Sequence, residues 1–527
     1  MVGSGDEEGA LDTLLVYKMV GVGLYLAVLL GIGVVASTRM KGLRDFYAAD
    51  KGLGFWAVAF SARATGESAW LLLGLTGMGA ALGVRGLWVV LGEVLGVVGA
   101  WLFMARRFRR LTGRYDSITV PDYLESRFRQ GPGRDRSLRV VAALALTVFV
   151  TVYVSAQIDA TGTAFESFLG VDYFVGAVVG FAVVLAYSVG GGFLAVVWSD
   201  VFQGTLMFLG LVALPLVGLW ALGSWGAMTA RLVAIDPSLL SLAGPDGWTG
   251  LTVMGTLGLA LIGLGFLGSP QIFARFIALR DEAEIPKGAW VAFVWTLLAD
   301  GGAVLAGMVG RALLTEPGQD PASVLGQGGQ DVLPLLVEAV MPPLLVGLFI
   351  AIVLSAIMST VDSLLVVASS AAVRDLYQQV FHPELDDASL MGLSRKATLG
   401  LSLVAFAVAM GVALLVEGRT VFWFVIFGWS GIAATFCPTM ILSLYWRGMT
   451  ARGALGAMVA GFIGVPLFKF GATALPGAGR YFAELAELPP AFALSFAAGV
   501  VLSLTDRDGR ARLEAEGAGD DLDEAGA

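Results

Sequence analysis

Cysteine and histidine are almost missing from this sequence, which holds one of each, Cys437 and His382. A single cysteine excludes an intrachain disulfide framework and a thiolate metal cluster. A single histidine in a polar loop argues against a histidine-based catalytic triad. The sequence also lacks a P-loop, a metal-binding histidine pair and a nucleophile elbow, so ATP-driven pumping has no support. We therefore expect a protein that is not an enzyme.

Charge is scarce as well. Only 14% of the 527 residues are charged, 57% are hydrophobic and the mean hydropathy is +0.81. Soluble domains carry about 25% charged residues, so we expect an all-α polytopic membrane protein. The net charge of −9 comes from acidic ends of the chain and gives no sign of nucleic-acid binding. The N-terminal MVGSGDEEGALD lacks the basic start of a secretory signal, so the first apolar run should remain a transmembrane helix.

Long apolar segments recur along the whole chain. Thirteen of them should cross the roughly 30 Å of hydrocarbon in a bilayer, at 13–36, 53–80, 83–105, 138–168, 171–190, 198–222, 250–274, 288–313, 343–373, 395–416, 420–445, 452–471 and 487–504. Most of the 33 Lys and Arg, Arg139 and Arg275 among them, then fall on one set of alternate loops. The positive-inside rule places those loops in the cytoplasm. This predicts an extracellular N-terminus and a cytoplasmic C-terminus.

Two of these segments are interrupted. The second contains SARATGESAWLLLGLTG, which puts Arg63 and Glu67 at membrane depth, and the seventh contains Gly268 and Pro270 in LIGLGFLGSPQIFARF. A charge inside a span costs about 2.5 to 3.5 kcal/mol on the permissive insertion scale, so it marks a pathway or a binding site. The second and seventh segments hold corresponding positions in two halves of five helices each. Interrupted helices in such positions indicate inverted repeats around a binding site near the middle of the membrane. The alternatives are ordinary kinks, and an Arg63–Glu67 pair that neutralises itself.

The ninth segment gathers hydroxyl groups around one carboxylate. Its sequence AIVLSAIMSTVDSLLVVASSA holds Ser355, Ser359, Thr360, Asp362 and Ser363. Such oxygens suit a dehydrated hard cation, although serine and threonine in helices also bond to the preceding turn. Further acids at membrane depth, which could be paired or act as relays, are Glu93, Asp159, Asp200 and Asp300. Aromatic side chains that could either wall a solute pocket or pack are Trp70, Tyr153 and Phe266.

Several ordered motifs carry a family resemblance: DFYAADKGLG, SARATGESAWLLLGLTG, TVPDYLESRF, YSVGGGFLAVVWSDVFQ, GSPQIFARF, SAIMSTVDSLLVVASSA and YWRGMTARGALGAMVAG. Together they resemble the sodium/solute symporter family, most closely its sodium/proline symporters. The resemblance implies a leucine-transporter-type fold with two inverted five-helix repeats, at 53–222 and 250–446. The rest of the implied organisation is an extracellular tail, first helix and first cytoplasmic loop in 1–52, an extracellular loop at 223–249, two peripheral helices in 447–504 and an acidic cytoplasmic tail at 505–527.

The resemblance also implies binding residues. The principal sodium ligands would be the carbonyls of Ala64, Glu67 and Ala356 and the hydroxyls of Ser359 and Thr360. A second sodium site, which some members have, would use Asp200, Ser359, Asp362 and Ser363. Solute-binding positions would be Ser68, Trp70, Tyr153 and Phe266.

This chain departs from the family pattern at the same places. Gly66 stands where the sodium/proline symporters have an aspartate, and the acid comes one position later as Glu67. In the seventh helix, Ile262 and Phe266 replace a Trp and a Tyr, and Ser269-Pro270-Gln271 replaces Gln-Pro-His. The pocket is therefore less polar than proline would lead one to expect.

The sequence thus predicts a sodium-coupled symporter that imports a small organic solute, such as the amino acid proline, across a bacterial plasma membrane. Na⁺ would be the coupling ion, without an organic cofactor, and the partners would be the solute, Na⁺ and the bilayer, with no nucleic acid and no obligate protein partner. One alternative is proton coupling through Glu67. Another is a membrane sensor that binds solute without transport, although the tail after Leu504 is too short for a signalling domain.

Overall fold

The computed structural model describes residues 4–38, 51–128, 136–188 and 193–526. The first cytoplasmic loop predicted before the second span falls mostly outside these ranges, as does the middle of the motif YSVGGGF. Within them the regular structure is helical, apart from an isolated parallel bridge between Leu53 and Leu279. The all-α prediction is confirmed.

The helices match the predicted spans in position. In the first half they are α1 (Ser4–Ser37), α3 (Phe55–Ala69), α4 (Thr76–Leu82), α5 (Leu87–Gly99), α6 (Ala105–Arg114), α7 (Val120–Arg127), α8 (Ser137–Leu169), α9 (Tyr173–Ser188), α10 (Phe193–Leu222) and α11 (Trp225–Ile235). In the second half they are α12 (Gly250–Ala260), α13 (Pro270–Ala278), α14 (Ile285–Leu314), α15 (Pro321–Leu325), α16 (Val332–Val340), α17 (Pro343–Ser370), α18 (Asp387–Leu415), α19 (Val421–Tyr445), α20 (Ala451–Pro466), α21 (Gly479–Leu485), α22 (Leu488–Thr505), α23 (Arg507–Ala515) and α24 (Ala518–Gly526).

Over the described residues, 11 helices are long and apolar enough to cross a membrane. One of these covers Phe55–Arg114, 60 residues, which is about 90 Å of straight helix at 1.5 Å per residue and far more than one crossing needs. It contains the second and third predicted spans, which meet at the short turn Gly83–Gly86. The fifth predicted span corresponds to the shorter apolar helix α9. Each of the thirteen predicted positions therefore holds a helix.

Both predicted interruptions are present. Near the end of α3, Ser68 has non-helical backbone angles (φ 46°, ψ −165°), and a π-helical turn, Trp70–Leu75, follows. After α12 the chain forms a 3₁₀ turn over Leu261–Leu267, then Gly268 and an extended Ser269, before α13 begins at Pro270. Proline suits the first position of a helix because its missing N–H would have no helical partner there.

Glycines let the central helices pack with their backbones in contact. A Cβ atom on Gly79 of α4 would lie 2.3 Å from the carbonyl oxygen of Val304 on α14. Likewise, a Cβ atom on Gly307 of α14 would lie 1.9 Å from the carbonyl oxygen of Thr76 on α4. Small residues are what membrane helices use for such close approach. The backbones of α4 and α14 are therefore in direct contact just after the interruption of α3.

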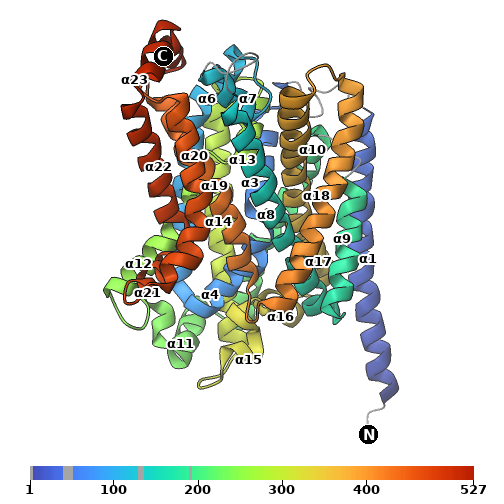
Figure 1. Ribbon diagram of the computed structural model, residues 1–527. Helices are drawn as coiled ribbons and strands as arrows, with labels where there is room; N and C mark the ends of the chain where they lie inside the picture. The colour runs from blue at the N-terminus through green and yellow to red at the C-terminus, as the bar shows by residue number, and fades with distance from the viewer. Residues whose placement is uncertain (1–3, 39–50, 129–135, 189–192, 527) are drawn as a thin grey trace.

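The two ends of the bundle differ. In Figure 1 the C-terminus, α6 and α7 lie at one end, and the N-terminus, α11, α15 and α16 lie at the other. At the first end, the predicted acidic tail is folded into α23 and α24. There Asp521 accepts a hydrogen bond from Tyr115 Oη and pairs with Arg114 at the end of α6. At the other end, α1 begins at Ser4, so helix extends through most of the predicted N-terminal tail.

Candidate functional site

The interrupted helix α3 lies directly against α17 at the predicted sodium ligands. Ser359 Oγ donates to the Ala64 carbonyl at 3.0 Å and to the Ala356 carbonyl at 3.1 Å. Thr360 Oγ1 donates to the Thr65 carbonyl at 3.1 Å. These carbonyls lie about one turn before Ser68, where the backbone of α3 leaves helical geometry.

The chemistry of these atoms fits a sodium ion. Hydroxyl and carbonyl oxygens of Ala64, Ala356 and Ser359 converge, with Thr360 beside them, and both hydroxyl side chains are fully buried. A hard cation needs several such oxygens. The fifth predicted ligand, the Glu67 carbonyl, is engaged elsewhere, because it accepts a hydrogen bond from the backbone N–H of Trp70. The structure therefore brings four of the five predicted residues together.

Beside this group, the predicted second sodium site contains an arginine. Arg275 Nη2 donates to Thr65 Oγ1 at 2.5 Å, to Ser363 Oγ at 2.6 Å and to Asp200 Oδ2 at 2.9 Å. Its Nε donates to Ser61 Oγ at 2.9 Å. Both partners of the ion pair, Arg275 and Asp200, are 0% exposed. The prediction that Arg275 lies in a cytoplasmic loop is wrong, because α13 carries it into the bundle.

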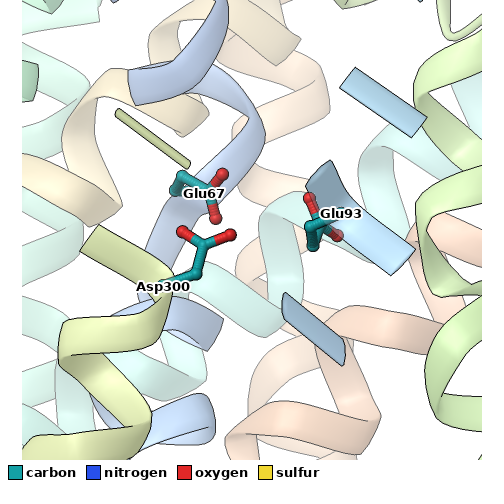
Figure 2. Close-up of side chains that lie close together, drawn as sticks. All are labelled: Glu67, Glu93 and Asp300. Carbon is teal, nitrogen blue, oxygen red and sulfur yellow. The ribbon is translucent and has the colours of Figure 1, made fainter. Parts of the chain in front are cut away.

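A second buried arginine lies on another face of α3. Arg63 forms an ion pair with Glu67, as the sequence allowed, but its Nη2 also lies 3.7 Å from Glu93 Oε2 of α5 and 3.9 Å from Asp300 Oδ2 of α14. Figure 2 shows the three carboxylates gathered from three helices. One oxygen from each lies within 4.8 Å of the others. Such spacing suits a cation, and here the guanidinium of Arg63 supplies the positive charge.

The predicted solute-binding residues are buried together around the interruption. Tyr153 Oη donates to Ser68 Oγ at 3.4 Å, and Gln157 Nε2 does so at 3.3 Å. The Gln157 side chain also accepts from the backbone N–H of Ala69 at 3.1 Å. Sequence reasoning missed Gln157, although a glutamine one turn beyond Tyr153 in an apolar helix was a visible signal.

Aromatic side chains from α19 complete this region, and the sequence did not indicate them. Trp70 packs edge-on against Phe422, with ring centroids 6.0 Å apart, and Phe266 packs against Trp429 at 4.9 Å. Phe266 also explains the glycine that departs from the family pattern. A Cβ atom on Gly66 would lie 2.9 Å from Phe266 Cε1, so a side chain at position 66 has no room beside this ring.

Cavities lie at the end of the bundle that holds α15 and α16. One of about 490 Å³ is lined by Arg85, Gln330 and Phe422, so it reaches the ring that packs on Trp70. Another, of about 580 Å³, is lined by acidic side chains and by Arg419. Of the predicted solute residues, Trp70 is one ring away from the cavity of about 490 Å³, and all four are buried, with 3% or less of each exposed.

At the opposite end, ion pairs join α7, α8 and the π-helical segment Ala371–Phe381 that continues α17. Arg139 donates to Asp122 at 2.7 Å and to Asp375 at 2.6 Å, and Arg374 donates to Asp122 at 3.1 Å. Arg139, predicted in a cytoplasmic loop, is thus buried in α8. Burial opposes ionisation of Asp122, but Arg374 and Arg139 outweigh it and hold the pKa of this carboxyl below its ordinary value.

Comparisons with known proteins agree with this arrangement. The model of a family described as "Sodium:solute symporter family" matches residues 46–461. The high-affinity proline transporter PutP of Bacillus subtilis (strain 168) is 36% identical over 434 residues, covering 82% of this chain and 87% of the relative. The sodium/proline symporter of Escherichia coli (strain K12) is 31% identical over 447 residues, covering 85% and 86%.

Solved structures confirm the fold. A Na⁺-coupled sialic acid symporter in a substrate-bound outward-open state superposes with a TM-score of 0.73 at 19% identity, covering 93% of this chain and 97% of that one. The nucleobase-cation-symport-1 family transporter Mhp1, in a closed conformation, gives a TM-score of 0.50 at 13% identity, covering 87% and 95%. The predicted leucine-transporter-type fold is therefore correct.

Proposed function

Because the chain belongs to the sodium:solute symporter family, and so is a Na⁺-coupled transporter and not an enzyme, we propose that it imports proline or a closely similar small amino acid. The observation that carries the ion-binding part of this proposal is the contact of Ser359 with the carbonyls of Ala64 and Ala356. In the proposal, Na⁺ replaces these hydrogen bonds and joins α3 to α17 through shared oxygen ligands.

The ion and the solute would stabilise each other through α3. This helix contributes Ala64 to the proposed ion site and, four residues later, Ser68 to the proposed solute site. Coupling between two ligands is reciprocal, so Na⁺ should raise solute affinity by the same factor by which solute raises Na⁺ affinity. Moving one charge inward across 100 mV supplies about 2.3 kcal/mol, which is enough to concentrate solute.

The direction of transport follows from the proposed topology. We place the end with the larger cavities outside and the arginine-rich end, with α6 and the Asp122–Arg139 pair, in the cytoplasm. In this orientation the two larger cavities face the extracellular side and the buried ion pairs lie on the cytoplasmic side. An importer would then accept Na⁺ and solute from the side with the cavities.

Proline is proposed on the names of the relatives. Relatives at 30 to 36% identity carry the name of proline transporters or sodium/proline symporters. The Phe266 ring beside Gly66 makes this wall less polar than proline would lead one to expect, but the hydroxyls of Ser68 and Tyr153 can meet the charged groups of an amino acid.

A thermal-shift experiment tests the solute. Purified protein is heated with proline, glycine betaine, alanine, leucine or sialic acid, in NaCl and in choline chloride. A ligand that binds only the folded state raises the unfolding temperature by mass action. Proline should give the largest shift, and only in NaCl. A larger shift with another solute would replace proline, and equal shifts in choline would refute the coupling to Na⁺.

The alternative of proton coupling through Glu67 predicts a different outcome. Uptake would then follow an inward pH gradient in the absence of Na⁺, and Glu67→Gln would abolish it. Sodium coupling predicts that a pH gradient alone drives no uptake.

A further inference from the structure

The acidic helix α24 near the end of the chain docks on the basic helix α6. α24 holds four acidic residues and no basic one, and α6 holds five arginines and no acidic one. Both lie at the same end of the bundle (Figure 1) and pack against each other, although 410 residues separate Arg114 of α6 from Glu524 of α24. Complementary charge on two surfaces in contact fixes their register and disfavours wrong partners. The tail therefore has a defined binding surface on its own chain.

Two carboxylates of α24 bind the end of α6. Asp521 lies 3.0 Å from Arg114 and accepts a hydrogen bond from Tyr115 Oη at 2.6 Å. Glu524 pairs with the same arginine. Residues three positions apart lie on one face of a helix, so Asp521 and Glu524 together turn the acidic face of α24 towards α6.

A third carboxylate joins α24 to another part of the bundle. Asp523 pairs with Arg447, which lies in the turn between α19 and α20. α6 ends the helical run Phe55–Arg114, which begins with α3 and belongs to the first predicted repeat, whereas α19 belongs to the second. Transporters built from two repeats work by moving one repeat or bundle against the other. A helix that is tied to both repeats should resist this movement.

The ion pairs at two of these positions are open to solvent. The side chains of Arg114 and Glu524 are 46% and 67% exposed, and those of Arg447 and Asp523 are 63% and 52% exposed. Salt screens exposed charges, because the Debye length falls from about 10 Å at 0.1 M to about 3 Å at 1 M. The large apolar side chain that α24 buries is that of Leu522. Ion pairs therefore supply much of the attachment, and salt should loosen it.

We infer that α24 is a latch that responds to ionic strength. At low ionic strength it holds α6 to the turn after α19 and slows the transport cycle, and at high ionic strength it is released and transport is faster. The inference rests on the proposed transport function and on the proposed cytoplasmic position of the tail. It adds regulation by the salt concentration on that side of the membrane.

Electron paramagnetic resonance of a spin-labelled tail measures the docking without transport. Cys437→Ser removes the single native cysteine, and Asp520→Cys places the label on an exposed position of α24. The mobility of the label should rise between about 0.05 M and about 0.5 M choline chloride, as the ion pairs are screened. In the neutralised variant, Asp521→Asn with Asp523→Asn and Glu524→Gln, the label should be mobile at both concentrations.

Uptake by proteoliposomes then connects the docking to transport. Radioactive proline uptake is measured at saturating external Na⁺, with choline chloride varied inside, where the tail lies, and sucrose balancing the osmolarity. The wild-type rate should rise at least about twofold with internal salt, because screening releases the latch. The neutralised variant, and a deletion of residues 518–527, should be fast at low salt and should not respond. Asp508→Asn with Glu514→Gln removes two exposed acids of α23 and should respond like the wild type.

The outcomes separate this inference from the proposed function. A label whose mobility does not change with salt would overturn the latch, whether or not the protein transports proline. Na⁺-dependent uptake at the same rate in the wild type, the neutralised variant and the deletion, at both internal salt concentrations, would overturn the latch and leave the proposed function intact. An absence of Na⁺-dependent uptake in every variant would overturn the proposed function, and its regulation with it.

Discussion

Ser359 Oγ on α17 lies 3.0 Å from the carbonyl oxygen of Ala64 on α3, and this contact joins an interrupted helix to an uninterrupted one. The same hydroxyl reaches the Ala356 carbonyl of its own helix. Three oxygens from two helices therefore converge at the point where α3 loses its regular geometry. A cation placed among them would couple the positions of the two helices.

Removing the hydroxyls should weaken sodium binding. In Ser359→Ala combined with Thr360→Ala, we expect the Na⁺ concentration for half-maximal thermal stabilisation to rise at least about tenfold, or about 1.4 kcal/mol. Ser355→Ala is the matched control, because Ser355 Oγ donates to the Ala351 carbonyl of its own helix at 2.8 Å and bonds with Tyr25 of α1, away from the proposed ligands on α3. Unchanged Na⁺ dependence in the double variant would contradict the proposed site.

Arg63 should be essential for stability. Replacing it with methionine leaves Glu67, Glu93 and Asp300 buried without their guanidinium, and breaking a buried ion pair in this way costs about 3 to 5 kcal/mol. We expect a strongly lowered unfolding temperature for Arg63→Met. Arg447→Met removes an exposed pair with Asp523 and should cost about 1 kcal/mol or less. Equal effects of the two substitutions would show that the Arg63 cluster contributes little.

Gly66 and Phe266 should be energetically coupled. Gly66→Asp restores the acid of related symporters but drives its Cβ to within 2.9 Å of the Phe266 ring, so it should destabilise the protein by about 1 to 3 kcal/mol. Phe266→Ala removes the obstacle. In a double-mutant cycle followed by thermal unfolding, the double variant should be more stable than the sum of the single effects predicts. Additive effects would mean that the two residues do not compete for space.

The ion pairs of Asp122 should give the protein a stability that depends on pH. Since its pKa in the folded protein is lower than the roughly 3.9 of an unfolded chain, the ionised carboxylate stabilises the fold at neutral pH. This contribution is lost as the pH falls below about 4 and through the folded-state pKa. Asp122→Asn should therefore lower the unfolding temperature at pH 7, with a smaller difference from the wild type at pH 3.5. The same difference at both pH values would exclude this role.

Local sequence signals predicted the helices and their interruptions, because hydropathy, Gly268 and Pro270 act within a few residues. The hydroxyls of Ser359 and Thr360 were likewise visible as a cluster in one segment. Their partner atoms on α3 came only from family resemblance, since backbone carbonyls leave no trace in a sequence.

Contacts between distant segments were beyond prediction. Arg275 follows Pro270 closely and precedes a polar loop, so counting basic residues placed it in the cytoplasm. Its burial depends on Asp200, which lies on another helix. Glu93 and Asp300 similarly looked like isolated acids, because only the packing of α5 and α14 against α3 brings them to Arg63. Pairing across helices is a property of the fold and cannot be derived from one segment.

Uptake by the reconstituted wild-type protein tests the central claim most directly. Proteoliposomes are given radioactive proline with an inward Na⁺ gradient, with an inward proton gradient in the absence of Na⁺, or with no gradient. The account predicts concentrative proline uptake in the first condition alone, increased by an inside-negative potential and abolished when the Na⁺ gradient is collapsed. Uptake at the same rate without Na⁺, or uptake driven by the proton gradient alone, would contradict it.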